Sequence, residues 1–301
     1  TQCDSQSAFV LTAQNNSYKD DALKRSAVAI ISPYECYEIL GIDPNMQIIG
    51  ITGTNGKTTT GAAIYSLLLD LHVKAAFQGT RGCFVNDKCI ESRSLTTPAI
   101  LQTLAHMSQA SKAQCAYFVM EVSSHAIAQE RIQSLKFALK IFTNLSQDHL
   151  DFHGSMEAYR NTKSKFFMDD SLKLINADEK SITYNRKNTH TYGIEHPADF
   201  GVKTYSLSEG IDALFWLKGK ECWVHSPLQG HFNLYNLLAA TAAVHLLENP
   251  PMSELESAIN GFAGVSGRME VVSQEPRVIV DFAHTPDGME QVLKSLKSHQ
   301  L

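Results

Sequence analysis

The sequence predicts an α/β protein with a mainly parallel sheet. Apolar, β-rich runs alternate with stretches of helical periodicity almost throughout the 301 residues, and the loops between them are rich in Gly, Thr, Asn or His. Such alternation is typical of strand–helix–strand units, in which consecutive strands lie parallel and the helices cover the sheet. Apolar residues make up 44% of the chain, which is enough to build ordinary globular cores.

Three strand–loop–helix units carry this prediction. The first has a strand over Gln47–Ile51, the loop TGTNGKTTT, and a helix through Leu69. The second has a strand over Ala116–Met120 that leads into EVSSHA. The third has a strand over Leu139–Phe142, then TNLSQDHLDFHG, and a helix near Met156–Phe167. Polar loops that follow apolar strands place candidate site residues at the carboxyl edge of the sheet, where ligands of α/β proteins bind.

Two turn-rich segments divide the chain. GIDPN (41–45) precedes the first strong strand, and the glycine-rich GFAGVSGRME (261–270) precedes a further strand over Val278–Asp281 and a new helix. One strand and one helix cannot build a core of their own, so we expect the last domain to be incomplete in this sequence. The predicted domains are 1–43, 44–264 and 265–301.

Charge and cysteine content exclude several classes of protein. The net charge is −5, and no basic run suggests a nucleic-acid or membrane-surface partner. No stretch approaches the ~18 to 20 apolar residues of a membrane span, and the first ten residues do not resemble a signal peptide. The six cysteines show no metal-binding spacing, which predicts free thiols in a reducing cytoplasm.

The segment Gly53–Thr59 is the strongest local signal for a nucleotide site. Glycines let backbone N–H groups close around phosphate oxygens, Lys57 can reach the terminal phosphates, and Thr58 offers a hydroxyl to magnesium. The usual motif has a glycine at the position that Ile51 occupies here, so the general pattern is met only in part. The alternative is a glycine turn with an incidental lysine. The predicted nucleotide-binding residues of this loop are Gly53, Thr54, Asn55, Gly56, Lys57, Thr58 and Thr59.

Acids and histidines follow the next two strands. Glu121 ends the second strand and is the best candidate for an acidic metal ligand; the alternative is a salt-bridged loop acid. Asp148, His149, Asp151 and His153 fall close together after the third strand, and carboxylate and imidazole both suit Mg²⁺ or Mn²⁺ sites. Not all of them can be ligands, so some orient the others or cap the next helix.

Lys163 lies on an apolar helix face. Met156, Tyr159, Lys163 and Phe166 share one side of the predicted helix, for which Ser155 is a plausible N-cap. Lys163 either extends its ammonium to water along the apolar stem or points into the same cleft as His149.

Two further pairs of polar residues occupy the starts of later helices. Asn233 and Asn236 lie one turn apart at the beginning of an alanine-rich helix, where they could bind a purine edge or cap the helix. Asp281 and His284 follow the last strand, and Thr285 and Pro286 read as the N-cap and first position of the last helix.

Taken in order, these segments resemble the Mur ligase family across about Gly50 to Leu293. The resemblance rests on TGTNGKTTT, LTTP, MEVSSHAIAQER, TNLSQDHLDFHGSMEAYRNTK, GHFNLYNLLAA, GRMEVV and VDFAHTPDGMEQVL. EVSSHA and DHLDFHG are specific to the branch that adds the third residue of the peptidoglycan stem peptide. The glycine loop is not, since folylpolyglutamate synthetases have a similar one.

The resemblance implies a three-domain architecture with a short N-terminal domain for the UDP-substrate, a central P-loop domain and a Rossmann-like C-terminal domain, here truncated. It implies an ATP- and Mg²⁺-dependent ligase that joins a free diamino acid, meso-diaminopimelate or L-lysine, to UDP-N-acetylmuramoyl-L-Ala-D-Glu through an acyl-phosphate. We expect a cytoplasmic monomer. A folylpolyglutamate synthetase, a P-loop ATPase that acts on a partner and a non-catalytic nucleotide-binding module are the alternatives.

The same resemblance implies residue roles. Lys57 and Thr58 hold ATP and magnesium; Glu121 and His149 bind metal, with Lys163 carbamylated beside them. Further contacts to ATP come from Asn233, Asn236, Arg268, Asp281 and His284. The muramoyl-peptide is held by Ser5, Thr96, Thr97, Ser123, Gln129 and Arg131. The family's N-terminal Asp-Ser-Arg is Asp4-Ser5-Gln6 here, and its motif for the incoming amino acid lies beyond Leu301.

Overall fold

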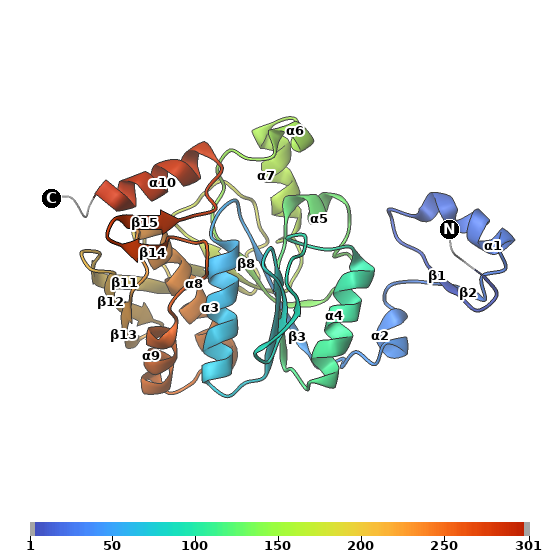
Figure 1. Cartoon of the computed structure of the whole chain (residues 1–301), viewed down its shortest axis with the longest axis horizontal. Helices are drawn as coiled ribbons and strands as arrows, with labels where there is room; N and C mark the ends of the chain where they lie inside the picture. Colours follow the sequence, from blue (N-terminus) through green and yellow to red (C-terminus); the bar gives the residue numbers. More distant parts are fainter. Residues whose placement is uncertain (1–3, 298–301) are drawn as a thin grey trace.

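The computed structural model describes residues 4–297, which are built around an eleven-stranded sheet (Figure 1). Its strands are β3 (Gln47–Thr52), β4 (Ala75–Gly79), β5 (Gly82–Val85), β6 (Lys88–Glu91), β7 (Tyr117–Glu121), β8 (Phe137–Phe142), β9 (Leu172–Asn176), β10 (Thr189–Tyr192), β11 (Phe200–Ser206), β12 (Ile211–Leu217) and β13 (Lys220–Ser226). The order across the sheet is β13-β12-β11-β10-β9-β8-β3-β7-β4-β5-β6.

The centre of the sheet is parallel, as predicted. Strands β4, β7, β3, β8, β9, β10 and β11 pair in parallel, and antiparallel hairpins extend both edges. The strand order places β7 and β8 on either side of β3. The loops that follow these three strands therefore meet at one edge. The α/β fold class predicted from the alternating pattern is confirmed; the antiparallel extensions were not predicted.

Helices cover both faces of the sheet (Figure 1). One core lies under α3 (Lys57–Asp70), α8 (His231–Glu248) and α9 (Met252–Gly261), which contribute Leu67, Leu237 and Leu255 among others. The opposite core includes Leu104 and Tyr159. Its helices are α2 (Cys36–Ile39), α4 (Ile100–Lys112), α5 (Ser124–Ala128) and α7 (Met156–Lys165). The short helix α6 (Leu150–His153), which precedes α7, has no buried residue. Burial on both faces explains why the central strands read as continuous apolar runs.

Two smaller units lie at opposite ends of the molecule (Figure 1). The N-terminal unit consists of β1 (Ala8–Val10), the short helix η1 (Asn16–Tyr18), α1 (Lys19–Lys24) and β2 (Ala29–Ile31), with β1 and β2 parallel. The C-terminal unit consists of β14 (Glu270–Gln274), β15 (Arg277–Val280) and α10 (Pro286–Lys297). Strand β14, which pairs with β15 in a hairpin, was not predicted. The Thr285 hydroxyl accepts from the Gly288 N–H, as expected of an N-cap. The three domain bounds stay a prediction.

Among the described residues, no helix combines the length and apolar character needed to cross a bilayer. The five described cysteines, Cys36, Cys83, Cys89, Cys115 and Cys222, are free thiols, as predicted; Cys3 lies outside the described residues.

Candidate active site

The glycine loop lies between β3 and α3, and the segment after β8 holds its shape. The Asn144 amide accepts from the Asn55 N–H at 2.9 Å, and the Thr143 hydroxyl donates to the Asn55 carbonyl at 2.7 Å. A Cβ atom on Gly53 would stand 1.9 Å from the Thr143 hydroxyl, and one on Gly56, whose φ is +84°, would stand 2.3 Å from Asn236. The close neighbours leave room only for glycine at both positions, so the loop is preformed for a ligand that approaches its backbone.

Lys57 and Lys163 converge on a single backbone oxygen of this loop. Lys57 donates to the Gly53 carbonyl at 2.9 Å and to the Thr54 carbonyl at 2.7 Å. Lys163 reaches the same Gly53 carbonyl at 2.9 Å from α7, and its side chain is only 1% exposed. Lys163 therefore points into the cleft and does not extend to water, which decides between the two interpretations of its helix face.

Burial disfavours the charged form of both lysines. Removal from water lowers the pKa of Lys163 well below its usual value, and the nearby charge of Lys57 lowers it further. The pKa of Lys57 is also lowered, mainly by burial, while Glu121 opposes that shift. An incoming anion such as a phosphate would favour the charged form of these lysines, since it would replace the lost solvation by charge-assisted hydrogen bonds.

Glu121 closes the site from the neighbouring strand β7. Its carboxylate is fully buried and accepts from the Thr80 N–H at 3.0 Å and the Thr80 hydroxyl at 3.3 Å. Burial raises its pKa, while the charge of Lys57 and a hydrogen bond from Thr58 act in the opposite direction. Within the described residues Glu121 makes no ion pair at salt-bridge distance, so it is not the salt-bridged loop acid of the alternative interpretation. A buried carboxylate beside a threonine hydroxyl, a lysine and an arginine is an arrangement typical of functional sites.

The histidines after β8 form an aromatic cluster beside the loop. His149 adopts a left-handed backbone conformation with φ of +51°, and its imidazole lies 3.2 Å from the Asp148 carboxylate. The ring of His125 is 4.8 Å from that of His149, and His153 bonds to the Ser124 hydroxyl at 3.0 Å. Asp148 is thus placed to orient His149, and the predicted role of His149 as a metal ligand stays a prediction. Ser155 caps α7 as predicted, by accepting from the Ala158 N–H.

Burial and neighbouring cations favour the neutral form of His149. Its pKa is lowered by burial first, although the Asp148 carboxylate acts in the opposite direction. A neutral imidazole has a free lone pair and can ligate a metal. Among the described residues, no three or more His, Cys, Asp or Glu side chains gather closely enough to hold a metal by themselves. A cation at this site would therefore need oxygen ligands from outside that set, such as the Thr58 hydroxyl or phosphates.

Asn233 and Asn236 lie under the phosphate loop at the start of α8. Both side chains are buried, and Asn236 donates to Asn233 at 3.0 Å. Asn236 accepts from Thr60 at 3.3 Å, and Asn233 donates to the Gln229 carbonyl at 2.8 Å. Neither side chain caps α8, because its N-cap position is Gly230. Their predicted contact with adenine stays a prediction.

The C-terminal unit contacts the same loop. Arg268 lies 3.5 Å from the Thr58 hydroxyl, and Asn55 donates to the Asp287 carboxylate at 3.2 Å. Asp281 accepts from the Met269 N–H at 2.8 Å, next to Arg268. His284 is exposed and bonds to the Phe282 carbonyl. Of the three residues predicted to reach ATP from this unit, Arg268 contacts the loop directly and Asp281 lies behind it.

Most of the residues predicted to hold the muramoyl-peptide form one hydrogen-bonded network beside α5. Arg131 donates to the Thr97 carbonyl at 2.8 Å and to the Gln129 amide at 3.0 Å, and the Thr97 hydroxyl accepts from the Ser123 N–H at 2.9 Å. Thr96 bonds through its hydroxyl to Thr80, the partner of Glu121. The network is thus linked to the acid at the end of β7. Ser5 is exposed in a turn of the N-terminal unit, outside this network.

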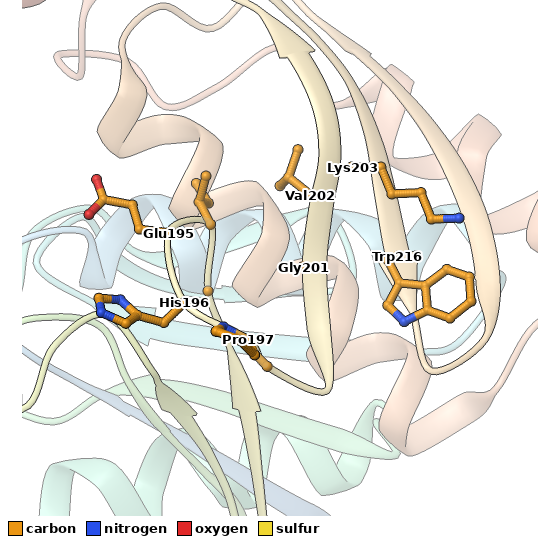
Figure 2. Close-up of a pocket in the computed structure, with 10 residues that line it drawn as sticks. Glu195, His196, Pro197, Gly201, Val202, Lys203 and Trp216 are labelled. Atoms are coloured by element: carbon orange, nitrogen blue, oxygen red, sulfur yellow. The ribbon is translucent and has the colours of Figure 1, made fainter.

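Two cavities lie outside the phosphate loop. One, of about 460 Å³, lies between the N-terminal unit with the segment directly after it and the residues on either side of Arg131; its lining includes Leu11, Asn16, Tyr34, Glu130 and Gln133. The other, of about 430 Å³, lies at the far side of the sheet between the loop after β10 and strands β11 and β12. Figure 2 shows Glu195 and His196 on one side of it and Lys203 and Trp216 on the other. It contains none of the predicted site residues.

Several residues of the site were not predicted. Thr80 bonds to Glu121, and Asn144 holds the glycine loop through Asn55. The Tyr159 hydroxyl lies 3.1 Å from the hydroxyl of Thr54. Asn144 follows a strand next to β3, so its place at the carboxyl edge was available as a signal. Thr80 offered no such signal, because it lies in a hairpin turn whose partner is distant in sequence.

Comparison with known proteins agrees with this geometry. The Mur ligase middle domain matches residues 51–244, and the Mur ligase glutamate ligase domain matches residues 267–300. The UDP-N-acetylmuramoyl-L-alanyl-D-glutamate--2,6-diaminopimelate ligase of Wolinella succinogenes is 49% identical over 300 residues, covering 100% of this chain and 69% of that protein. The chain spans about two thirds of the length of three such curated relatives.

Solved structures show the same architecture. A UDP-N-acetylmuramoyl-L-alanyl-D-glutamate--2,6-diaminopimelate ligase superposes with a TM-score of 0.80 at 26% identity, covering 99% of this chain and 70% of that one. A Mycobacterium tuberculosis folylpolyglutamate synthase complexed with ADP superposes with a TM-score of 0.70 at 17% identity, covering 88% of this chain and 69% of that one. The latter likeness shows the fold alone. With a family domain matched over most of the chain and a relative that is 49% identical over the whole of this chain, this chain belongs to the Mur ligase family.

Proposed function

We propose that the chain carries the nucleotide- and UDP-substrate-binding parts of a ligase that joins 2,6-diaminopimelate to UDP-N-acetylmuramoyl-L-alanyl-D-glutamate at the expense of ATP. The observation that carries the proposal is the convergence of Lys57 and Lys163 on the Gly53 carbonyl, with buried Glu121 at the next strand end. The names of the relatives supply the substrates. They favour diaminopimelate over lysine, which the sequence alone leaves open.

The residues of the loop fit ATP and Mg²⁺. Backbone N–H groups at the start of α3 and the Lys57 ammonium suit phosphate oxygens. The Thr58 hydroxyl and the Glu121 carboxylate are hard oxygen donors of the kind that Mg²⁺ prefers, and a hydrogen bond already joins them. When bound, the ion would neutralise charge on the phosphates. Asn233, Asn236, Asp281 and His284 are proposed to contact the nucleotide from α8 and the C-terminal unit.

The network of Thr97, Ser123, Gln129 and Arg131 is proposed to hold the UDP-muramoyl-dipeptide. Gln14 of the N-terminal unit donates to Gln129 at 3.1 Å, so the network also touches the unit expected to bind the UDP part. The cavity of about 460 Å³ beside it offers space between the two units. A guanidinium is suited to phosphate or carboxylate groups because its donors match two acceptor oxygens.

The proposed reaction has two steps. An oxygen of the substrate carboxylate attacks the γ-phosphorus of ATP, a new P–O bond forms, the bond to the β-phosphate oxygen breaks, and ADP leaves. The amine of diaminopimelate then attacks the acyl carbon, phosphate leaves, and the nitrogen loses a proton. Lys57 offsets the charge on the transferring phosphoryl group, and Lys163 reaches the same Gly53 carbonyl as Lys57. The chain therefore acts mainly by positioning the reactants and by stabilising the charge that develops on them. Arg268, arriving from the C-terminal unit, helps to exclude water from the acyl-phosphate.

A phosphate-release assay tests this function. We expect phosphate release that requires both UDP-muramoyl-dipeptide and meso-diaminopimelate, with L-lysine and folate as poor replacements. Release without any acceptor would support the P-loop ATPase alternative, and release with folate would support the folylpolyglutamate synthetase. The monomeric state and the cytoplasmic location stay predictions.

Replacing Arg131 with alanine should raise the KM for the UDP-substrate by roughly tenfold and leave the KM for ATP nearly unchanged. The reason is that Arg131 bonds to Thr97 and Gln129 and makes no contact with the glycine loop. Steady-state kinetics with each substrate varied in turn measure both constants. The exposed Arg160 of α7 is a suitable control, since Arg160→Ala should change neither. Equal weakening of both substrates by Arg131→Ala would refute the assignment.

A further inference from the structure

Arg81 connects Glu121 of the candidate active site to the linker (262–269) that joins α9 to the C-terminal unit. It lies in the turn between β4 and β5, directly after Thr80, whose N–H and hydroxyl both bond to Glu121. From this turn the Arg81 guanidinium donates to the backbone carbonyl of Ser266 at 3.0 Å. Neighbouring residues of one tight turn thus hold the buried carboxylate on one side and the linker on the other.

The linker itself is a compact, internally bonded turn. Glu270 accepts from the Gly267 N–H at 2.6 Å and from the Ser266 hydroxyl at 2.9 Å, and the Arg268 N–H donates to the Val265 carbonyl at 3.0 Å. Gly267 has a φ of +74°, and a Cβ there would stand 2.5 Å from Phe282. These bonds make the segment move as one body, so a contact that fixes Ser266 also fixes Arg268.

The position of Arg268 depends on this arrangement. Its guanidinium lies 3.5 Å from the Thr58 hydroxyl and 5.3 Å from the centre of the Phe282 ring. The hydroxyl of Thr58 in turn bonds to Glu121. A closed loop of contacts therefore surrounds the first turn of α3. It runs through Arg268, Thr58, Glu121, Thr80, Arg81 and Ser266.

We propose that Arg81 is a positioning residue that fixes the linker against the β4–β5 turn and thereby presents Arg268 to the phosphate loop. Without this contact, the linker and the C-terminal unit would keep fewer bonds to the central sheet and would open more often. Since Arg268 would then leave Thr58 in a larger fraction of molecules, the loss affects turnover more than binding of the UDP-substrate. The part of the proposal that concerns turnover rests on the proposed function.

Limited trypsin digestion measures the opening of the linker directly. Trypsin can cleave the Arg268–Met269 bond only when the linker detaches from the β4–β5 turn and from Thr58. Arg81→Met should speed cleavage at this bond by about fivefold to tenfold, as expected when one solvent-exposed hydrogen bond is lost. Arg81→Lys keeps a cationic donor for the single Ser266 oxygen and should recover most of the protection. Arg186→Met, which removes an exposed arginine distant from the linker in sequence, should digest like the wild type.

Kinetics separate a positioning role from a structural one. We expect Arg81→Met to lower kcat by a similar factor while the KM for the UDP-substrate stays at the wild-type value, and Arg81→Lys to restore kcat. Wild-type digestion and kcat for Arg81→Met would overturn the proposal. So would a lowered melting temperature for both Arg81 variants with no rescue by lysine, since that is the result of a merely structural role. If the wild type shows no acceptor-dependent phosphate release, the proposed function fails, and the digestion rates still decide the role of Arg81.

Discussion

Replacing Lys163 with alanine should lower ligase turnover by roughly 10² to 10⁴-fold, the range seen when an electrostatic group of a transition state is removed. Lys163 is 1% exposed and bonds to the same Gly53 carbonyl as Lys57. Burial and the neighbouring cation favour its neutral amine, which can take up CO₂. The product, a carbamate, replaces a cation by an anion with two oxygens and would suit a hard metal ion or orient the γ-phosphate.

Chemical rescue distinguishes the carbamate from a plain ammonium. A small carboxylic acid such as acetate or formate should restore part of the turnover of Lys163→Ala, because it supplies two oxygens to the vacated space. Lys163→Arg should be inactive and should not be rescued, because the guanidinium is a permanent cation that cannot form a carbamate and that fills the space. The exposed Lys165 on the same helix provides the matched control, and Lys165→Ala should keep wild-type turnover. Full activity of Lys163→Ala, or carbon NMR of the active enzyme with labelled CO₂ that shows no carbamate signal, would exclude the modification.

Replacing Lys57 with alanine should lower turnover by on the order of 10²-fold or more while the protein stays folded. Lys57 is the first residue of α3, and within residues 4–297 its ammonium donates hydrogen bonds to the Gly53 and Thr54 carbonyls of the loop and to no other group. Its loss removes a cation from the phosphate site but no apolar packing from the core beneath. Phosphate release measures the rate, and circular dichroism with a thermal melt confirms the fold.

The matched control for this experiment is Lys74→Ala, which removes an exposed lysine whose hydrogen bond goes to Gln114. It should leave turnover unchanged. Near-normal activity of Lys57→Ala, with the control behaving as expected, would refute the phosphate-loop assignment. A drop in melting temperature that accounts for the lost activity would show that Lys57 stabilises the loop and does not bind phosphate.

The parts of the fold and site that could be predicted share a local cause. Strand β3 and helix α3 flank the glycine loop because an apolar run, a turn and a helical pattern follow each other in sequence. Lys163 was placed on a buried face by helical spacing alone, and Glu121 was placed at a strand end by the apolar run before it. The meeting of these residues follows from the rule that parallel strands end at one edge.

The parts that could not be predicted depend on contacts between distant segments. The packing of α7 on the sheet decides whether Lys163 reaches the Gly53 carbonyl or water. The spacing of apolar residues along the helix does not predict that packing. Thr80 and Arg81 lie in a hairpin turn whose partners, Glu121 and Ser266, follow far along the chain. The antiparallel strands β12 and β13 carry an alternating pattern, but nothing local says that they extend the same sheet.

The transfer of a labelled oxygen tests the central claim most directly. UDP-muramoyl-dipeptide carrying heavy oxygen in the reacting carboxylate is turned over with ATP, magnesium and diaminopimelate, and the released phosphate is analysed by mass spectrometry. An acyl-phosphate intermediate requires that one carboxylate oxygen leaves with the phosphate, so we predict phosphate that carries a single heavy oxygen. Unlabelled phosphate, with the displaced heavy oxygen found in AMP or in water, would contradict a ligase that works through an acyl-phosphate.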